Sequence, residues 1–433
     1  MKLPWITFLI TLALASIFTK ITGDTSSIPY FICYIITGFV LMLTLVSELK
    51  LSRRWLFPFW VAMTLQMAGF AYLLVISDNG SNLSATSHVP FLSVNPDNYP
   101  GYARNYALNG ITTKLNYSQW LGYVYRLVGI QSGVGIMLSI LFSYTAITFF
   151  VKTVRYYDST LIDKLPFNIG LLYLLFYPQM LSESLQIHRE ALIICCLSIS
   201  LYHFIHWWRE RKLHSMMIAI LACLPAGYLH AGSIFVAVGI GIVFICYLNN
   251  RDKVVIDVKT FMALVFVIGI AVFVVTHMEL GKFDNLDVQN VAETRGGRLG
   301  DGGSGYQAGF HIPIPILSAI INTPIKSFYF LASPLPTYWR SIVDILTFLL
   351  SSLFYIVPIF YTLSHRKKLN NNLLFVIIGI ILIFTIPFAW GVNNSGTAVR
   401  HRTKAVIWIA FAIVLLIQEL QIKRQQKLER VKR

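Results

Sequence analysis

The chain has 433 residues, of which 56% are hydrophobic and only 12% are charged. A soluble domain carries about 25% charged residues, so this composition excludes an ordinary water-soluble protein and predicts an all-α integral membrane protein. The net charge of +16 is expected to reflect membrane topology, because basic residues collect in cytoplasmic loops, and no nucleic-acid partner is expected.

Apolar runs recur along the whole chain and predict one membrane domain, residues 1–433, built as a polytopic helical bundle. A span needs about 20 mostly apolar residues, and on this criterion about twelve spans are expected. They lie near 4–19, 28–47, 55–76, 130–151, 165–181, 191–208, 213–229, 231–248, 260–277, 341–363, 373–390 and 405–422. The first is expected to be an uncleaved helix, since no clean cleavage site follows it and a second span comes close behind.

The segment 312–339 is apolar but is interrupted by prolines. Because proline removes a backbone donor and disrupts helix interiors, the segment is expected to be re-entrant or interfacial and buried against protein. The prolines are Pro313, Pro315, Pro324, Pro334 and Pro336.

The basic residues of the short loops predict the orientation. With both termini in the cytoplasm, every loop on that side is basic, and the basic tail after Ile422 lies near anionic lipid. Two long loops then face outward, 77–129 and 278–340, and the first contains an amphipathic stretch from Trp120 to Val128 that is expected to lie along the interface.

The cysteines and glycines carry no sign of a cofactor. All five cysteines lie in apolar runs without metal-ligand spacing and are expected to be buried structural thiols. The glycine-rich segment 295–305 is not followed by Gly-Lys-Ser/Thr, so it is not a Walker loop. No cofactor is expected.

The first candidate site opens the span near 191–208. Glu183, His188, Arg189 and Glu190 place four titratable groups at the outer mouth of two short predicted helices. One interpretation is that Arg189 binds an anionic substrate while a neighbouring carboxylate orients it. The alternative is a helix cap with a surface ion pair, since a carboxylate in the first helical turn favours the helix dipole.

The second candidate site is the short outer loop 391–404. Arg400 and Arg402 flank His401, and Lys404 follows, so the loop opposes the positive-inside trend. Arginine presents a planar fork suited to bidentate contact with phosphate, and a lipid-linked pyrophosphate would lie at this depth. A tolerated run of outer charges is the alternative, and whether the loop is helical or extended stays open.

Three further residues are weaker candidates. Arg340 lies four residues before Asp344 and is either a ligand-binding cation or that residue's helical partner. His230 occupies a tight outer turn, where a structural role is the simpler interpretation. Asp97 in the first long loop is either a general base or sugar ligand, or a turn-forming residue after Pro96.

Three short segments resemble the Wzy-type polysaccharide polymerases of bacterial capsule and exopolysaccharide synthesis. They are Asp97-Asn-Tyr99 in the first long loop, the helix start Leu185–Leu192, and Asn394–Arg402 in the last outer loop. The resemblance implies a GT-C-like fold among the multi-spanning glycosyltransferases that use lipid-linked sugars. Paired acidic residues, common in the first loop of other members of that wider group, are missing here, so no bound metal is expected.

The resemblance also implies a reaction at the outer face of the bacterial cytoplasmic membrane. A glycan on undecaprenyl diphosphate would be transferred to a new lipid-linked repeat unit, and a chain-length regulator and a flippase would be partners. Arg189, Arg400, Arg402 and Arg340 would bind the diphosphate, where negative charge develops. The residues expected to assist or accept a proton are Asp97, Glu183, Glu190, His188 and His401.

Two other functions remain open. One is a transferase or ligase that adds a single sugar from a polyprenyl-phosphate donor. The other is a flippase or exporter of lipid-linked glycan, which would place charges along the interior of the bundle. The predicted spans are nearly free of charge in their middle, and this favours an active site at the outer face.

Overall fold

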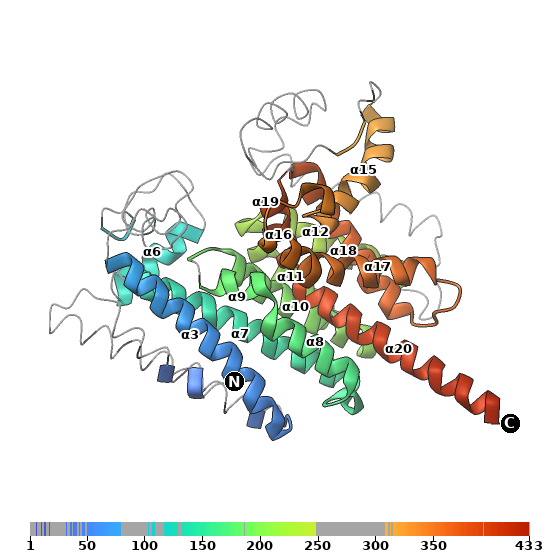
Figure 1. Ribbon diagram of the computed structural model, residues 1–433, viewed down its shortest axis with the longest axis horizontal. Helices are drawn as coiled ribbons and strands as arrows, with labels where there is room; N and C mark the ends of the chain where they lie inside the picture. The colour runs from blue at the N-terminus through green and yellow to red at the C-terminus, as the bar shows by residue number, and fades with distance from the viewer. Residues whose placement is uncertain are drawn as a thin grey trace. The chain divides into compact units, whose positions relative to one another are not determined.

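The computed structural model describes residues 50–78, 117–128, 132–185, 187–247, 315–392 and 394–432, with scattered positions among 6–47, 103–108 and 308–312. Among these residues the regular structure is helical and contains no strand, as the sequence predicts (Figure 1). Five of the described helices are long and apolar enough to cross a membrane, and they identify a helical membrane protein. These are Val134–Tyr157, Glu190–Glu210, Ile342–Ser364, Asn372–Gly391 and Val406–Val431.

The helices form two compact units, and the chain passes between them several times. Unit 1 comprises Met1–Arg155, Leu171–Phe176 and Met180–Cys195. Unit 2 comprises Tyr156–Gly170, Tyr177–Gln179 and Cys196–Arg433.

Unit 1 contains the helix α3 (Leu56–Asp78), the helix α6 (Tyr117–Val128) and most of α7 (Ser132–Tyr157). The predicted spans near 55–76 and 130–151 are confirmed as helices. The amphipathic stretch is confirmed as α6, which buries one face at four-residue spacing through Tyr117, Leu121 and Tyr125. Its position at the membrane interface stays a prediction.

The predicted span near 165–181 is wrong as a single helix. The chain forms α8 (Leu165–Phe176), leaves the helical conformation at Tyr177, and starts the short helix α9 (Pro178–Ser184). The reason is Pro178, because the residue before a proline is pushed away from helical dihedral angles. With twelve residues and a rise of about 1.5 Å each, α8 is too short to cross a bilayer alone.

Unit 2 is organised around α18 (Asn372–Gly391). It packs against α12 (Ile234–Tyr247), α15 (Pro315–Ala332) and α20 (Val406–Lys432), and α12 also contacts α11 (Leu213–Leu229). Because α18 is apolar on every side, it is buried at the centre of these helices.

The expectation that prolines break the segment 312–339 is wrong for Pro315–Ala332, which form one helix. The single helix α15 contains Pro324, and Pro315 occupies its first position, where a missing N–H costs nothing. After Ala332 the chain leaves the helix, as expected, and it forms the 3-10 turn Pro336–Tyr338. Whether α15 is re-entrant stays a prediction.

The predicted span near 341–363 is a continuous helix with a wider central turn. It consists of α16 (Ile342–Thr347), a π-helical segment (Phe348–Ser352) and α17 (Leu353–Ser364). π-helical turns are rare and occur often at functional sites. This one turns the hydroxyl groups of Ser351 and Ser352 into the interior of unit 2.

The remaining predicted spans have different outcomes. Those near 191–208, 213–229, 373–390 and 405–422 are confirmed as the helices α10 (Glu190–Glu210), α11, α18 and α20, and that near 231–248 as α12 after a 3-10 turn. Those near 4–19 and 28–47 are described only at scattered helical positions, and that near 260–277 lies outside the described residues. A total of about twelve spans therefore stays a prediction.

Candidate functional site

The first candidate cluster lies in unit 1, at the turn between α9 and α10. Glu183 ends α9 and Glu190 begins α10, and these carboxylates are only 6% and 2% exposed. Oε2 of Glu183 lies 3.6 Å from Nδ1 of His188. One ligand atom from each of Glu183, His188 and Glu190 lies within 4.8 Å of the other two. We call these three residues the carboxylate–histidine cluster.

Close packing holds the carboxylate–histidine cluster in place. A Cβ atom at Gly135 of α7 would lie 2.6 Å from Ile187 and 3.1 Å from the Tyr125 hydroxyl, so only glycine lets the turn approach α7 this closely. Nε2 of Gln66 on α3 donates a hydrogen bond of 2.9 Å to Oγ of Ser184. The cluster therefore rests on two long helices of its own unit.

Two tyrosines of α6 border this cluster. Burial raises the pKa of Tyr117 above its ordinary range, and the nearby Glu190 carboxylate adds to the rise. Burial also raises the pKa of Tyr125, with a smaller contribution from Tyr117. Both phenols are therefore neutral at physiological pH, and their hydroxyl groups can donate hydrogen bonds.

The second candidate cluster lies in unit 2 and is centred on the short helix α19 (Ser395–Thr403). Asn394 caps this helix by accepting a hydrogen bond from the N–H of Thr397, so the loop left open by the sequence is helical. Arg402 and Lys404 are both 0% exposed, and His401 is 5% exposed. We call Arg400, His401, Arg402 and Lys404 the α19 cation cluster.

The guanidinium of Arg402 makes five hydrogen bonds to neutral oxygen atoms. It donates to Oγ of Ser351 from Nε at 3.1 Å and from Nη2 at 2.9 Å, and to Oγ of Ser352 from Nη2 at 2.9 Å. Nη1 donates to the carbonyl oxygens of Phe330 at 3.2 Å and Leu331 at 2.9 Å. Because a guanidinium has five N–H groups, a phosphate could reach Arg402 only by displacing one of these bonds.

The other buried cation of α19 faces aromatic rings. Nζ of Lys404 lies 2.7 Å from Nδ1 of His401 and 5.4 Å from the ring centre of Phe388. The His401 ring lies 4.7 Å from that of His230, which stacks on Phe388 at 5.0 Å. The turn at His230 and the helix α19 therefore meet in unit 2, and their position at the outer face stays a prediction.

Three more residues are predicted to belong to the site, namely Arg400, Arg340 and Asp97. Arg400 lies one residue before His401 and is only partly buried. Arg340 precedes the N-cap Ser341, and its backbone N–H donates to Oδ2 of Asp344 at 2.9 Å, so the two residues do not share a helix face. Asp97 lies outside the described residues.

Several residues of these clusters were not anticipated from the sequence. In unit 2 they are Ser351 and Ser352, and the adjacent hydroxyls inside an apolar run are the signal that marks them. In unit 1 they are Gln66, Tyr117 and Tyr125, and only Gln66 has a comparable signal, as an amide inside a span. The metal-like spacing of the carboxylate–histidine cluster was also not expected.

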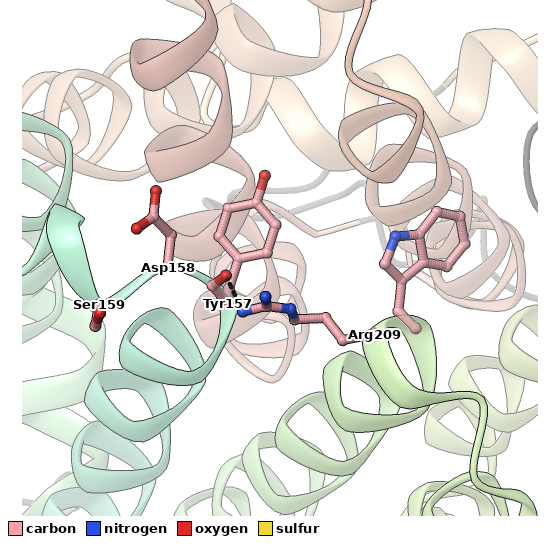
Figure 2. A pocket seen from close by; sticks show the side chains of 5 residues that line it. Tyr157, Asp158, Ser159 and Arg209 are labelled. Carbon is pink, nitrogen blue, oxygen red and sulfur yellow. Dashed lines mark hydrogen bonds between the residues drawn. The ribbon is translucent and has the colours of Figure 1, made fainter.

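Unit 2 also has a cavity that is lined by other residues than those of the α19 cation cluster. It has a volume of about 590 Å³ and is lined by Tyr157, Asp158, Ser159, Trp208 and Arg209 (Figure 2). Nη1 of Arg209 donates to the carbonyl oxygens of Tyr156 and Tyr157, each at 2.6 Å, so its guanidinium is held against the backbone. None of the predicted site residues lines this cavity.

Comparisons of the chain with family models, with curated proteins and with solved structures give no match.

Proposed function

We propose that the chain is a polysaccharide polymerase of the Wzy type, which joins undecaprenyl-diphosphate-linked repeat units at the outer face of the bacterial cytoplasmic membrane. The observation that carries this proposal is Arg400, a partly exposed cation on the short helix α19, directly before the apolar helix α20. Cations beside membrane-spanning segments are costly unless they have a task. A lipid-linked diphosphate is an anion that would arrive at this depth.

Arg400 is the residue of α19 that we assign to the diphosphate. It is partly exposed, whereas the five N–H groups of Arg402 are used inside the protein. Arg402 is accordingly a positioning residue that fixes α19. In this proposal it does not contact the diphosphate, which is the role expected for it from the sequence. Arginine presents two parallel N–H groups to two phosphate oxygens, whereas lysine binds phosphate as a point charge.

The proposed reaction needs a cation at the leaving group and a base at the acceptor. An acceptor hydroxyl oxygen attacks the anomeric carbon of the growing chain, and the bond from that carbon to the diphosphate breaks. The acceptor proton passes to a carboxylate that acts as general base, while Arg400 of α19, assisted by the neighbouring His401, stabilises the departing undecaprenyl diphosphate.

The proposal includes a GT-C-like bundle of about twelve spans with both termini in the cytoplasm. The arrangement of unit 2 supports the expected alternation of its loops between the two sides of the membrane. His230 and His401, both expected outside, are in contact, whereas Tyr157, Asn371 and Glu419, expected at the cytoplasmic end, line one shared cavity. Loops on one side of a membrane must lie at one end of a helical bundle, as these do.

Deletion of the gene tests the polymerase function most directly. Lipid-linked glycan extracted from the deleted strain is expected to carry single repeat units, and long chains are expected to disappear. If chain length is unchanged, the proposal is wrong. Repeat units that lack one sugar would indicate a single-sugar transferase, and complete repeats retained on the cytoplasmic side would indicate a flippase.

The substitution Arg400→Lys tests the diphosphate contact while keeping the charge. We expect polymerisation of lipid-linked repeats by purified protein to fall by about 10- to 100-fold, because the bidentate contact is lost. Arg366→Lys, in an exposed turn after α17, is the matched control and should keep full activity. Normal polymer length with Arg400→Lys would contradict the assignment.

A further inference from the structure

The carboxylate–histidine cluster of unit 1 has the composition of a cation site. It brings two carboxylates and one imidazole together, with one ligand atom of each within 4.8 Å of the others. Atoms that share a metal ion at about 2.1 Å lie roughly 3.0–4.2 Å apart. The separation of 3.6 Å between Glu183 Oε2 and His188 Nδ1 falls within that range.

The state of Glu183 gives a second observation. Its side chain is nine-tenths buried, and its Oε2 atom, which faces His188, accepts no hydrogen bond from the described residues. The distance of 3.6 Å to Nδ1 is too long for a hydrogen bond. A buried carboxylate oxygen without a donor is costly, and a bound cation would remove that cost.

The neighbouring carboxylate strengthens this argument. Glu190, at the other end of the same turn, is only 2% exposed. Two carboxylates in one buried site repel each other, and a bound cation relieves this repulsion. The hydroxyl-bearing α6 face at Tyr117 and Tyr125 lies beside them and supplies neutral donors, not a compensating charge.

We propose that Glu183, His188 and Glu190 bind one divalent transition-metal cation, with Mn²⁺ and Zn²⁺ as the ions that suit this ligand set. One imidazole and two carboxylates match these ions, whereas Mg²⁺ prefers oxygen ligands alone. The ion would join the end of α9 to the start of α10 and fix the turn between them. This site does not depend on the proposed polymerase activity, since ion binding can be measured without any substrate.

Mn²⁺ binding to the full-length protein in detergent tests the site. Mn²⁺ is the first probe because Cys195 and Cys223 are buried cysteines, and thiolates favour Zn²⁺ over Mn²⁺. Protein stripped with EDTA is titrated while the electron paramagnetic resonance signal of free Mn²⁺ is recorded. We expect one Mn²⁺ per chain and a rise in the unfolding temperature on binding.

Variants distinguish this site from adventitious binding. Glu183→Gln and His188→Gln are each expected to weaken Mn²⁺ binding by about 100-fold or more, beyond the loss typical of outer-shell changes. Glu419→Gln on α20 is the control, because it also neutralises a buried carboxylate but leaves the cluster intact. Wild-type protein that binds no Mn²⁺ or Zn²⁺, or cluster variants that bind as well as wild type, would overturn the proposal.

Discussion

The carboxylate–histidine cluster of unit 1 and the α19 cation cluster of unit 2 both bury charge, but they compensate it in opposite ways. Arg402 has a neutral oxygen for every N–H group, so its charge is solvated by the protein itself. Glu183 keeps a buried oxygen without a donor next to a second carboxylate. A saturated charge supports the structure, whereas an unsaturated one is available to a ligand or a proton.

The largest loss of stability is expected when Arg402 is replaced. Replacing it by methionine removes the five hydrogen bonds that Arg402 donates to the buried oxygen atoms of Ser351, Ser352, Phe330 and Leu331. We expect the free energy of unfolding to fall by about 3–5 kcal/mol, measured by denaturation of the purified protein.

Arg402→Lys should also destabilise the protein, because an ammonium group has three N–H groups where five are needed. The matched control is Arg400→Met on the same helix, which is expected to change stability by less than about 0.5 kcal/mol. If Arg400→Met destabilises as much as Arg402→Met, the structural role assigned to Arg402 is wrong.

A second prediction concerns the packing that holds the carboxylate–histidine cluster. Gly135→Ala places a methyl group 2.6 Å from Ile187, so the turn must move away from α7. We expect a loss of about 1–3 kcal/mol in the free energy of unfolding, together with weaker Mn²⁺ binding.

Gly379→Ala in α18 is the control for this substitution. Its added methyl group meets no atom within 4 Å, and alanine is the better helix former by roughly 0.5–1 kcal/mol. Stability is therefore expected to rise slightly. Equal losses in the two variants would show that the approach at Gly135 is not special.

The third prediction has the opposite sign. In protein freed of metal, Glu183→Gln removes one of two neighbouring buried carboxylates while it keeps the shape of the side chain. We expect the free energy of unfolding to stay level or rise by about 1 kcal/mol. A fall of more than about 2 kcal/mol would mean that the carboxylate is compensated as fully as Arg402 is.

The sequence predicts the helices of this protein better than it predicts the partners in its sites. The apolar run at 213–229 matches α11 at both ends, because basic residues precede it and a histidine turn follows. The break at Tyr177 follows from Pro178 and could have been foreseen. Long apolar runs specify a helix whatever surrounds them.

The site residues show where this kind of prediction stops. Charged residues at helix ends are conspicuous in an apolar sequence, so the sequence predicts most members of both clusters. The partners of Arg402 lie 50 to 72 residues away along the chain, and only the folded unit brings them to it. Burial decides whether an arginine supports the fold or contacts a ligand, and burial is a property of packing.

The smallest effect is expected at the hydrogen bond from Gln66 to Ser184 in unit 1. This long-range hydrogen bond helps to fix the end of α9, whereas in unit 2 five hydrogen bonds hold Arg402. Gln66→Leu keeps most of the volume, and Ser184 still donates to the carbonyl oxygen of Leu181 at 2.7 Å. We therefore expect the free energy of unfolding, measured by thermal denaturation, to fall by only about 1 kcal/mol. Thr64→Val on the same helix, which removes a local bond at an exposed position, should change almost nothing. If Gln66→Leu costs as much as Arg402→Met, hydrogen-bond saturation does not distinguish the two regions.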